Sequence, residues 1–325
     1  MRALVFDRHL EFRADYPDPA PLAGESIVRV TLAGICGTDL EIVRGYMAFR
    51  GVPGHEFVGR VTETENSALR GHRVVGEINA ACGRCERCQA GLGRHCPSRT
   101  VLGILNRDGA FAEMLRLPDA NLIPIPDSIP DEVAVFAEPI AAAYEILEQA
   151  RPALENSRSA GRILILGDGR LAAVAATALA AEDFPVEIAG RHREKLDRIA
   201  RLHRNIAVPP NIGQPLNRSY PVVIDCTGSP AGFERAMELV APRGTIILKS
   251  TARASKALNL APVVVNEITV LGSRCGRFAP ALETLESGKI DPRPLISGAF
   301  DLKDGADAFA AAAQPPNFKI LLRAT

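Results

Sequence analysis

An apolar strand that leads through a Gly-rich turn into an Ala-rich helix constrains the fold of this chain more than any other feature. The strand is Ile-Leu-Ile-Leu at 163–166, and G-D-G-R-L-A follows at 167–172. In a G-x-G-x-x-A pattern after a strand, Gly167 allows the tight turn, Gly169 lets the backbone approach a pyrophosphate, and the alanine permits close packing of helix and sheet. The pyrophosphate would bind at the helix N-terminus; a plain strand–turn–helix is the alternative. The predicted cofactor-binding residues of this loop are Gly167, Gly169, Arg170 and Leu171.

Strands and helices alternate from this point onward. Alternation of this kind predicts βαβ units and a parallel sheet, and so an α/β fold for this part of the chain. The predicted strands are 162–166, 186–189, 222–225, 245–248 and 268–271, and the predicted helices are 170–182, 193–203 and 231–240.

The first third of the chain has a different pattern. Short β runs at 27–32, 57–61 and 73–76 are separated by Pro and Gly residues. Short strands with frequent turn signals indicate a small β-barrel or sandwich. With 325 residues the chain is long enough for two domains. A helical pattern at 131–149, which the Glu138-Pro139 pair is expected to break or kink, leads into the α/β part.

Composition excludes several classes of protein. Lys plus Arg and Asp plus Glu number 38 each, so the formal net charge is zero, which argues against nucleic-acid binding. No apolar run reaches membrane-spanning length, and the first residues lack the apolar stretch of a secretory signal. The seven cysteines are an odd number, which fits metal ligands and free thiols better than a disulfide framework. We therefore expect a cytoplasmic protein without a membrane or nucleic-acid partner.

Four of the cysteines lie within fifteen residues. Cys82, Cys85, Cys88 and Cys96 have the spacing C-x2-C-x2-C-x7-C in a Gly- and Arg-rich loop. Four thiolates so close together can bind a structural zinc ion and leave no open position. Paired disulfides and an iron–sulfur cluster are the alternatives. Because the loop has little apolar surface to bury, a metal would supply the free energy that orders it.

The choice between NAD(H) and NADP(H) depends on the end of the second α/β strand. An Asp or Glu roughly 20 residues after the glycine loop would bind the ribose 2′-hydroxyl of NAD. This chain has Gly190 there, followed by Arg191. A small residue and a guanidinium suit a 2′-phosphate, so the sequence predicts NADP(H) in preference to NAD(H). The alternative is that Arg191 and His192 only begin a solvated helical turn.

Three further short motifs contain residues that can bind zinc. They are G-I-C-G-T-D at 34–39, G-H-E-F-V-G at 54–59 and A-E-P at 137–139. Cys36, His55 and Glu138 together would leave a fourth position open for a substrate. Taken alone, each of the three would be read as core packing or as a charge at a helix end.

These motifs, the cysteine lobe and the nucleotide loop occur in an order and at spacings that resemble those of the zinc-dependent medium-chain dehydrogenases/reductases, of the alcohol, polyol and threonine dehydrogenase type. The resemblance covers nearly the whole chain. It implies a GroES-like β-barrel catalytic domain at 1–140 with a zinc lobe at 80–97, a Rossmann domain with a doubly wound parallel sheet at 141–276, and a C-terminal return to the catalytic domain at 277–325.

The resemblance also implies roles for individual residues. Cys36 and His55 would be ligands of a catalytic zinc ion, with Glu138 at the third ligand position. Glu56 would be an alternative ligand and Asp39 would orient His55. Thr38 would bond the substrate hydroxyl. Ser273 and Arg274 would lie by the nicotinamide. The family often has a histidine where this chain has Glu41, which leaves open whether Glu41 joins the proton relay or is a solvated charge.

The sequence thus predicts an NAD(P)-dependent zinc oxidoreductase with two zinc ions per chain, acting on a small alcohol or carbonyl compound of the secondary alcohol or polyol type. By resemblance it would be a homodimer or homotetramer. One alternative is a non-enzymatic nucleotide-binding member of the same fold with a sensing or structural role. Another is an interaction module that works through the 82–96 lobe.

Overall fold

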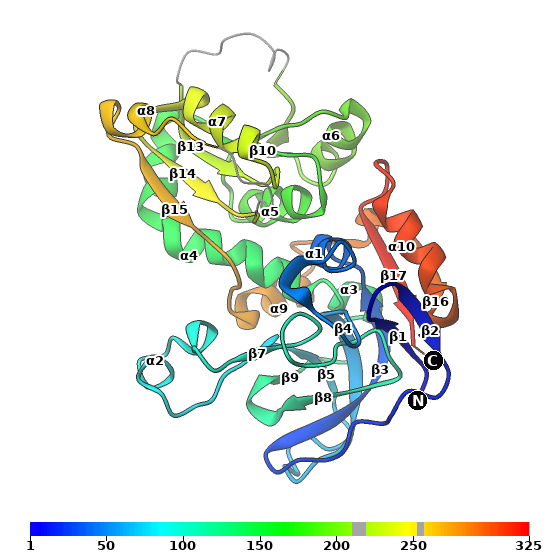
Figure 1. Ribbon diagram of the computed structural model, residues 1–325. Coiled ribbons are helices and arrows are strands. Elements are labelled where there is room, and N and C mark those ends of the chain that lie inside the picture. Colours follow the sequence, from blue (N-terminus) through cyan, green and yellow to red (C-terminus); the bar gives the residue numbers. More distant parts are fainter. Residues whose placement is uncertain (210–218, 252–256, 325) are drawn as a thin grey trace. The chain divides into compact units, whose positions relative to one another are not determined.

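The computed structural model describes residues 1–209, 219–251 and 257–324, and the chain forms two compact units (Figure 1). The first unit comprises Met1–Glu138, Leu282–Ser287 and Pro292–Thr325, and the second comprises Pro139–Ala281 and Gly288–Asp291. The N-terminal and C-terminal parts of the chain therefore belong to the same unit.

A six-stranded parallel sheet forms the centre of the second unit, in the order β12-β11-β10-β13-β14-β15. The order reverses between β10 and β13, so ligands are expected at the carboxyl ends of these two strands. This sheet confirms the predicted doubly wound α/β fold. Its strands are β10 (Ile163–Leu166), β11 (Val186–Ala189), β12 (Ile206–Ala207), β13 (Tyr220–Asp225), β14 (Val240–Leu248) and β15 (Thr269–Gly272).

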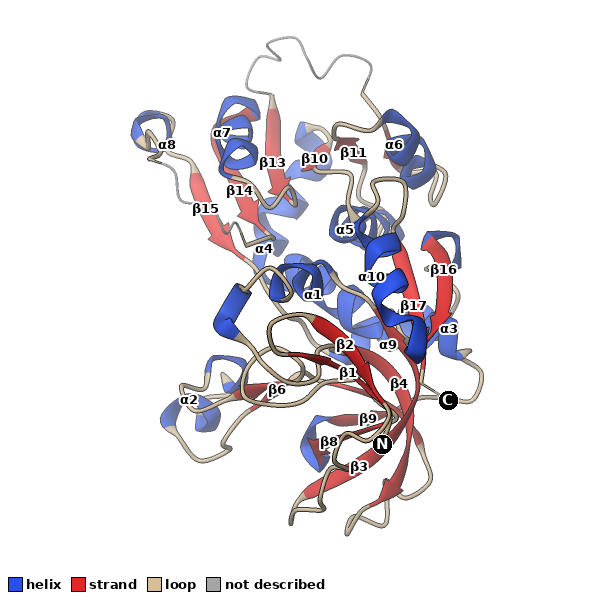
Figure 2. Ribbon diagram, turned by 45° about the vertical axis from the view of Figure 1, so that its right-hand side comes forward, coloured by secondary structure: helices blue, strands red, loops and turns tan. Residues whose placement is uncertain are grey.

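Helices cover both faces of this sheet (Figure 2). The crossovers of β10 to β11 and of β13 to β14 run in opposite directions, and right-handed connections then place α5 and α7 on opposite faces. Leu164 belongs to the same buried apolar cluster as Phe233 and Met237 of α7, and all four residues of β10 are buried, as expected for a strand covered on both faces. The helices are α4 (Ala137–Ala160), α5 (Arg170–Ala181), α6 (Arg193–Ala200), α7 (Pro230–Leu239) and α8 (Ala261–Val265).

The predicted interruption at Glu138-Pro139 lies elsewhere in the structure. Helix α3 (Asp131–Ala134) ends before Val135, and α4 begins at Ala137. Pro139 is the third residue of α4, where a backbone N–H would have no partner within the helix, so the proline does not break it. Pro152, which the prediction did not consider, lies inside α4.

The first unit is built on a bent sheet in the order β16-β17-β3-β4-β5-β9, with β8 also paired to β3. Strand β17, near the C-terminus, pairs antiparallel with β3, so the end of the chain completes a sheet that the beginning starts. Register shifts within the pairing of β3 and β4 increase the bend. The strands are β3 (Glu25–Gly34), β4 (Glu56–Glu63), β5 (Arg73–Gly76), β8 (Met114–Pro118), β9 (Leu122–Pro124), β16 (Ile296–Asp301) and β17 (Lys319–Arg323).

Two small two-stranded sheets and several helices complete this part of the chain. The sheets pair β1 (Ala3–Phe6) with β2 (Leu10–Arg13) and β6 (Asn79–Ala80) with β7 (Thr100–Val101). The helices are α1 (Gly37–Ile42), α2 (Glu86–Gln89), α9 (Phe278–Glu286), which crosses the unit boundary, and α10 (Gly305–Ala313). Among the described residues, no helix has the length and apolar character needed to span a membrane.

Candidate active site

The pairing of β3 with β4 brings Cys36, His55 and Glu56 together. Gly34 at the end of β3 lies opposite Glu56, the first residue of β4, so the residues that follow one strand and precede the other are neighbours. The sulfur of Cys36, a ring nitrogen of His55 and a carboxylate oxygen of Glu56 all lie within 4.8 Å of one another. One thiol, one imidazole and one carboxylate form a donor set that suits zinc.

Asp39 connects the two segments that carry these residues. Its side chain is fully buried, and its Oδ2 accepts the backbone N–H of Cys36 at 2.7 Å while its Oδ1 accepts that of Gly54 at 3.3 Å. The same Oδ1 lies 3.2 Å from Nδ1 of His55. Asp39 therefore lies on the Nδ1 side of the imidazole, which leaves Nε2 for a metal, although the separation does not make a well-aligned hydrogen bond. That Asp39 orients His55 stays a prediction.

The surroundings of His55 favour a positive charge. Burial lowers the pKa of His55, but the charges of Asp39 and Cys36 raise it more, and the resulting pKa lies well above the ordinary value. An electronegative, buried cluster of this kind is suited to a bound cation.

Glu56 also contacts Lys319 of β17, a residue that the sequence analysis did not single out. The Nζ of Lys319 bonds Oε2 of Glu56, and both side chains are almost fully buried. Gly34 lies between them, and a Cβ there would come within 2.5 Å of the Glu56 carboxylate. The ammonium group also lies 5.5 Å from the ring centroid of Phe136. The glycine thus makes room for a buried ion pair next to the cluster.

Glu138 is not a member of the group within 4.8 Å, although it responds to the same charges. Burial raises the pKa of Glu138, His55 opposes this, and Glu56 and Glu77 raise it further, to about 7. No hydrogen-bond donor from the described parts of the chain reaches its carboxylate. Glu77 is a second acidic neighbour that the sequence analysis missed.

Thr38 and Glu41 both lie on α1 but have different surroundings. The Oγ1 of Thr38 is 3.9 Å from the sulfur of Cys36, within reach of anything bound there. The carboxylate of Glu41 pairs with Arg44 at 2.7 Å and its side chain is 39% exposed. Glu41 therefore resembles a solvated helix charge more than a member of a relay.

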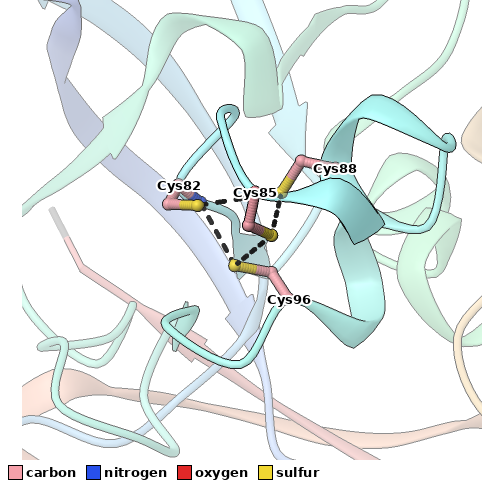
Figure 3. A group of neighbouring side chains, drawn as sticks. All are labelled: Cys82, Cys85, Cys88 and Cys96. Atoms are coloured by element: carbon pink, nitrogen blue, oxygen red, sulfur yellow. Dashed lines mark hydrogen bonds between the residues drawn. The ribbon is translucent and has the colours of Figure 1, made fainter.

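The four clustered cysteines form a second group, shown in Figure 3. The sulfur of Cys85 lies 3.5 Å from that of Cys88 and 3.8 Å from that of Cys96, and Cys82 lies 3.9 Å from Cys88. A tetrahedral zinc ion with bonds of about 2.3 Å would separate its sulfurs by about 3.8 Å. Disulfide sulfurs would be about 2.05 Å apart, and a cluster of several irons would hold the cysteines farther apart. The spacing fits a single ion best.

The pKa values of two of these thiols are shifted in opposite directions by their surroundings. The N–H groups of Arg84 and Cys85 lower the pKa of Cys82 to about 6. Desolvation and the Cys85 thiol raise the pKa of Cys88 to about 12. A bound metal ion would bring all four cysteines to the same thiolate state, because a coordinating thiol loses its proton.

In the second unit the glycine loop has the geometry that phosphate binding requires. Gly167 has φ +123°, and a Cβ there would lie 3.0 Å from the carbonyl oxygen of Cys226. Gly169 is the N-cap of α5, and a Cβ there would contact nothing within 4 Å, so its backbone faces open space. Arg170 and Leu171 form the first turn of α5. At a helix N-terminus the first backbone N–H groups have no partner within the helix and point toward a site where an anion can bind.

Ser273 and Arg274 directly follow β15, the last strand of the parallel sheet. Lys249 follows β14, and its buried ammonium donates to Oγ of Ser273 at 3.1 Å and to the carbonyl oxygen of Arg274 at 2.5 Å. Lys249 therefore fixes the segment at the carboxyl edge of the sheet, a link the sequence analysis did not find. Gly190 and Arg191 lie at the carboxyl end of β11, and both are exposed.

Comparisons with known proteins agree with this arrangement. Residues 22–127 match the family model for the alcohol dehydrogenase GroES-like domain, and residues 169–287 match that for zinc-binding dehydrogenase. Starvation-sensing protein RspB of Escherichia coli is 30% identical, with 90% of this chain and 89% of that protein covered. An L-threonine 3-dehydrogenase of Streptomyces avermitilis is 29% identical, with 95% and 94% covered.

The structural comparison gives the same picture over the whole chain. The solved structure of a short chain alcohol dehydrogenase (rspB) from Escherichia coli CFT073, complexed with NADH, has a TM-score of 0.85 and 28% identity, and the match covers 99% of both chains. These matches confirm the predicted fold class, a GroES-like part combined with a dinucleotide-binding part.

Proposed function

Because this chain belongs to the zinc-dependent medium-chain dehydrogenase family, we propose that it is a zinc oxidoreductase that transfers a hydride between a nicotinamide cofactor and an alcohol or carbonyl substrate. The observation that carries the proposal is the pair of cysteine-containing groups. One has four sulfurs and is closed, and the other combines Cys36, His55 and a carboxylate and leaves a position for a substrate. The substrate class would be a secondary alcohol or a polyol.

Cys36 and His55 would hold the catalytic zinc, with Glu138 as the third protein ligand and Glu56 as the alternative one. Lys319 already neutralises Glu56, whereas the Glu138 carboxylate has a raised pKa and would gain most from a cation. When bound, the zinc supplies Lewis-acid polarisation of the substrate oxygen and the nicotinamide accepts or donates the hydride.

The remaining residues position and protect these groups. Asp39 would hold His55 in one ring orientation. Thr38 would accept a hydrogen bond from the substrate hydroxyl, take its proton and donate its own proton to water, to a ribose hydroxyl of the cofactor or to Glu56. Gly167, Gly169, Arg170 and Leu171 would bind the pyrophosphate, and Lys249 would fix Ser273 and Arg274 beside the nicotinamide. The sequence-based preference for NADP(H) stays a prediction.

The test is cofactor-dependent turnover of a panel of alcohols and carbonyls, followed by the absorbance of the reduced cofactor, together with elemental analysis. We expect two zinc ions per chain. Cys36→Ala should lose the catalytic ion and turnover while keeping the fold, as checked by circular dichroism. One metal ion per chain in the wild type, or iron in place of zinc, would contradict the assignment.

A matched pair on α1 tests the proton path. Thr38→Val keeps the side-chain shape without the hydroxyl, and should lower kcat by about 10²-fold, the usual scale of acid–base assistance. Glu41→Gln should change kcat only a few-fold, since its charge already pairs with Arg44 in solvent. A unit shift of the pH profile in Glu41→Gln would instead assign that side chain to the relay.

The alternative function is non-enzymatic nucleotide binding with a sensing role, and the name of the starvation-sensing relative favours it. It predicts cofactor binding without turnover of any substrate in the panel, even with both zinc sites filled. A reducing, cytoplasmic setting suits either function, since the lobe requires its four cysteines as thiolates.

A further inference from the structure

A carboxylate from the glycine loop lies at the end of the neighbouring strand β11. Asp168 is the residue between Gly167 and Gly169, and its Oδ2 accepts the backbone N–H groups of Arg191 at 2.6 Å and His192 at 2.9 Å. The same oxygen lies 3.1 Å from Nδ1 of His192. The parallel pairing of Leu166 with Ala189 brings the two loops together.

Gly190 is required for this arrangement. A Cβ at position 190 would lie 2.6 Å from Oδ2, 2.7 Å from Cβ and 2.9 Å from Cγ of Asp168. The space that a side chain at the end of β11 would fill is therefore occupied by the Asp168 carboxylate. Dinucleotide-binding domains specific for NAD usually place an acidic side chain at that strand end, against the ribose 2′-hydroxyl.

The second oxygen of Asp168 remains available. All of its hydrogen bonds with described residues go to Oδ2, so Oδ1 keeps its lone pairs, and the side chain is 13% exposed. Burial raises the pKa of Asp168, but the N–H groups of His192 and Arg191 and the charge of Lys195 lower it more, to below the ordinary value. The group is thus a fixed anion at neutral pH with one oxygen free to accept a hydroxyl.

We infer, on the premise of the nicotinamide-dependent function proposed above, that Asp168 accepts the ribose 2′-hydroxyl of the cofactor and thereby selects NAD(H) over NADP(H). A 2′-phosphate would meet the charge of Asp168 and would find the N–H groups of Arg191 and His192 already bonded. The prediction of NADP(H) depends on the guanidinium of Arg191. Arg191 is exposed, and its charge does not offset the repulsion between the Asp168 carboxylate and a 2′-phosphate.

The experiment uses ADP-ribose and 2′-phospho-ADP-ribose as probes, with binding to the zinc-loaded protein measured by calorimetry. These probes report the adenosine end of the site independently of hydride transfer. The wild type should bind ADP-ribose at least tenfold more tightly. Asp168→Asn keeps an oxygen that can accept the two N–H groups but removes the charge, and should lower this ratio at least tenfold. Asp183→Asn is the matched control, because Asp183 lies beyond the far end of the 12-residue helix α5 and has φ +60°, which asparagine tolerates.

Gly190→Ala provides a second, independent variant. It keeps the charge of Asp168 but displaces its carboxylate, so ADP-ribose binding should weaken. The thermal unfolding midpoint of the variant checks that it is folded. The wild-type protein alone already tests the inference, through its ratio of affinities for the two probes. Tighter binding of 2′-phospho-ADP-ribose than of ADP-ribose would overturn it. So would an unchanged ratio in Asp168→Asn, which would make Asp168 only a link between two loops. If neither probe binds, the nicotinamide function itself fails; if ADP-ribose binds but no substrate is turned over, only the catalytic proposal fails.

Discussion

At the scale of single residues, the buried pair of Glu56 and Lys319 has the greatest consequence for stability. Both side chains are at most 3% exposed, and they come from strands at opposite ends of the chain. Removing one partner of a buried pair leaves the other charge desolvated, which costs about 3–5 kcal/mol. We expect Lys319→Met to lower the free energy of unfolding in urea by about this amount and to weaken the fold around β17.

Two further variants show whether the lost positive charge causes the loss of stability in Lys319→Met. Lys319→Arg keeps the positive charge and should recover most of the lost stability. Lys303→Met removes an exposed lysine of the same C-terminal segment and should change the free energy of unfolding by less than about 0.5 kcal/mol. If Lys319→Met were as stable as Lys303→Met, the Glu56 carboxylate would not depend on Lys319.

At the scale of elements, the cysteine lobe is a segment with almost no core of its own. Helix α2 has four residues and none is buried, and of the four sulfur-bearing residues only Cys96 is fully buried. Its order should therefore depend on the metal. Cys85→Ser should lower the zinc content from two ions to one and make the lobe sensitive to trypsin at its arginines. Cys275→Ser, outside both cysteine groups, should do neither, and a trypsin-resistant Cys85→Ser lobe would contradict a metal-ordered segment.

Features formed by residues close together in the sequence were predicted better than contacts between residues far apart in it. The parallel sheet, the glycine loop and the four-cysteine lobe depend on residues a few positions apart, and their periodicity and spacing are readable directly. Glu56 and Lys319 are 263 residues apart, and only the pairing of β17 with β3 brings them together. Asp168 occupies an unassigned position of the G-x-G-x-x-A pattern, and its contact with Gly190 depends on the register of β10 and β11, which the pattern does not give.

Pro139 in α4 shows that the effect of a residue can be known from the sequence while its position within a helix is not. Pro139 has a predictable local effect, namely the loss of an N–H, but the effect depends on where the helix begins. Since α4 begins at Ala137, the proline falls in its first turn and is tolerated. The two residues between α3 and α4, Val135 and Phe136, are both buried, and burial depends on the tertiary fold, which the local sequence pattern does not show.

At the scale of the whole molecule, one edge of the parallel sheet carries an unusual apolar surface. Strand β15 pairs only with β14 among the described strands, so its other edge is open. Next to it in sequence, Val264 and Val265 of α8 are 76% and 79% exposed, and Val270 of β15 is 40% exposed. An open edge beside exposed valines is a surface that proteins usually cover, and a two-fold pairing of identical edges covers both copies at once.

We therefore predict that the chain is a homodimer joined through β15 and α8, and that a tetramer would pair two such dimers through another surface. The double variant Val264→Lys, Val265→Lys places like charges on both sides of the two-fold axis and should give a monomer by light scattering coupled to size-exclusion chromatography. Leu22→Lys changes an equally apolar and 52% exposed side chain in the first unit, and should leave the dimer intact. A monomeric wild type, or a double-lysine variant that still dimerises, would show that this edge is not the interface.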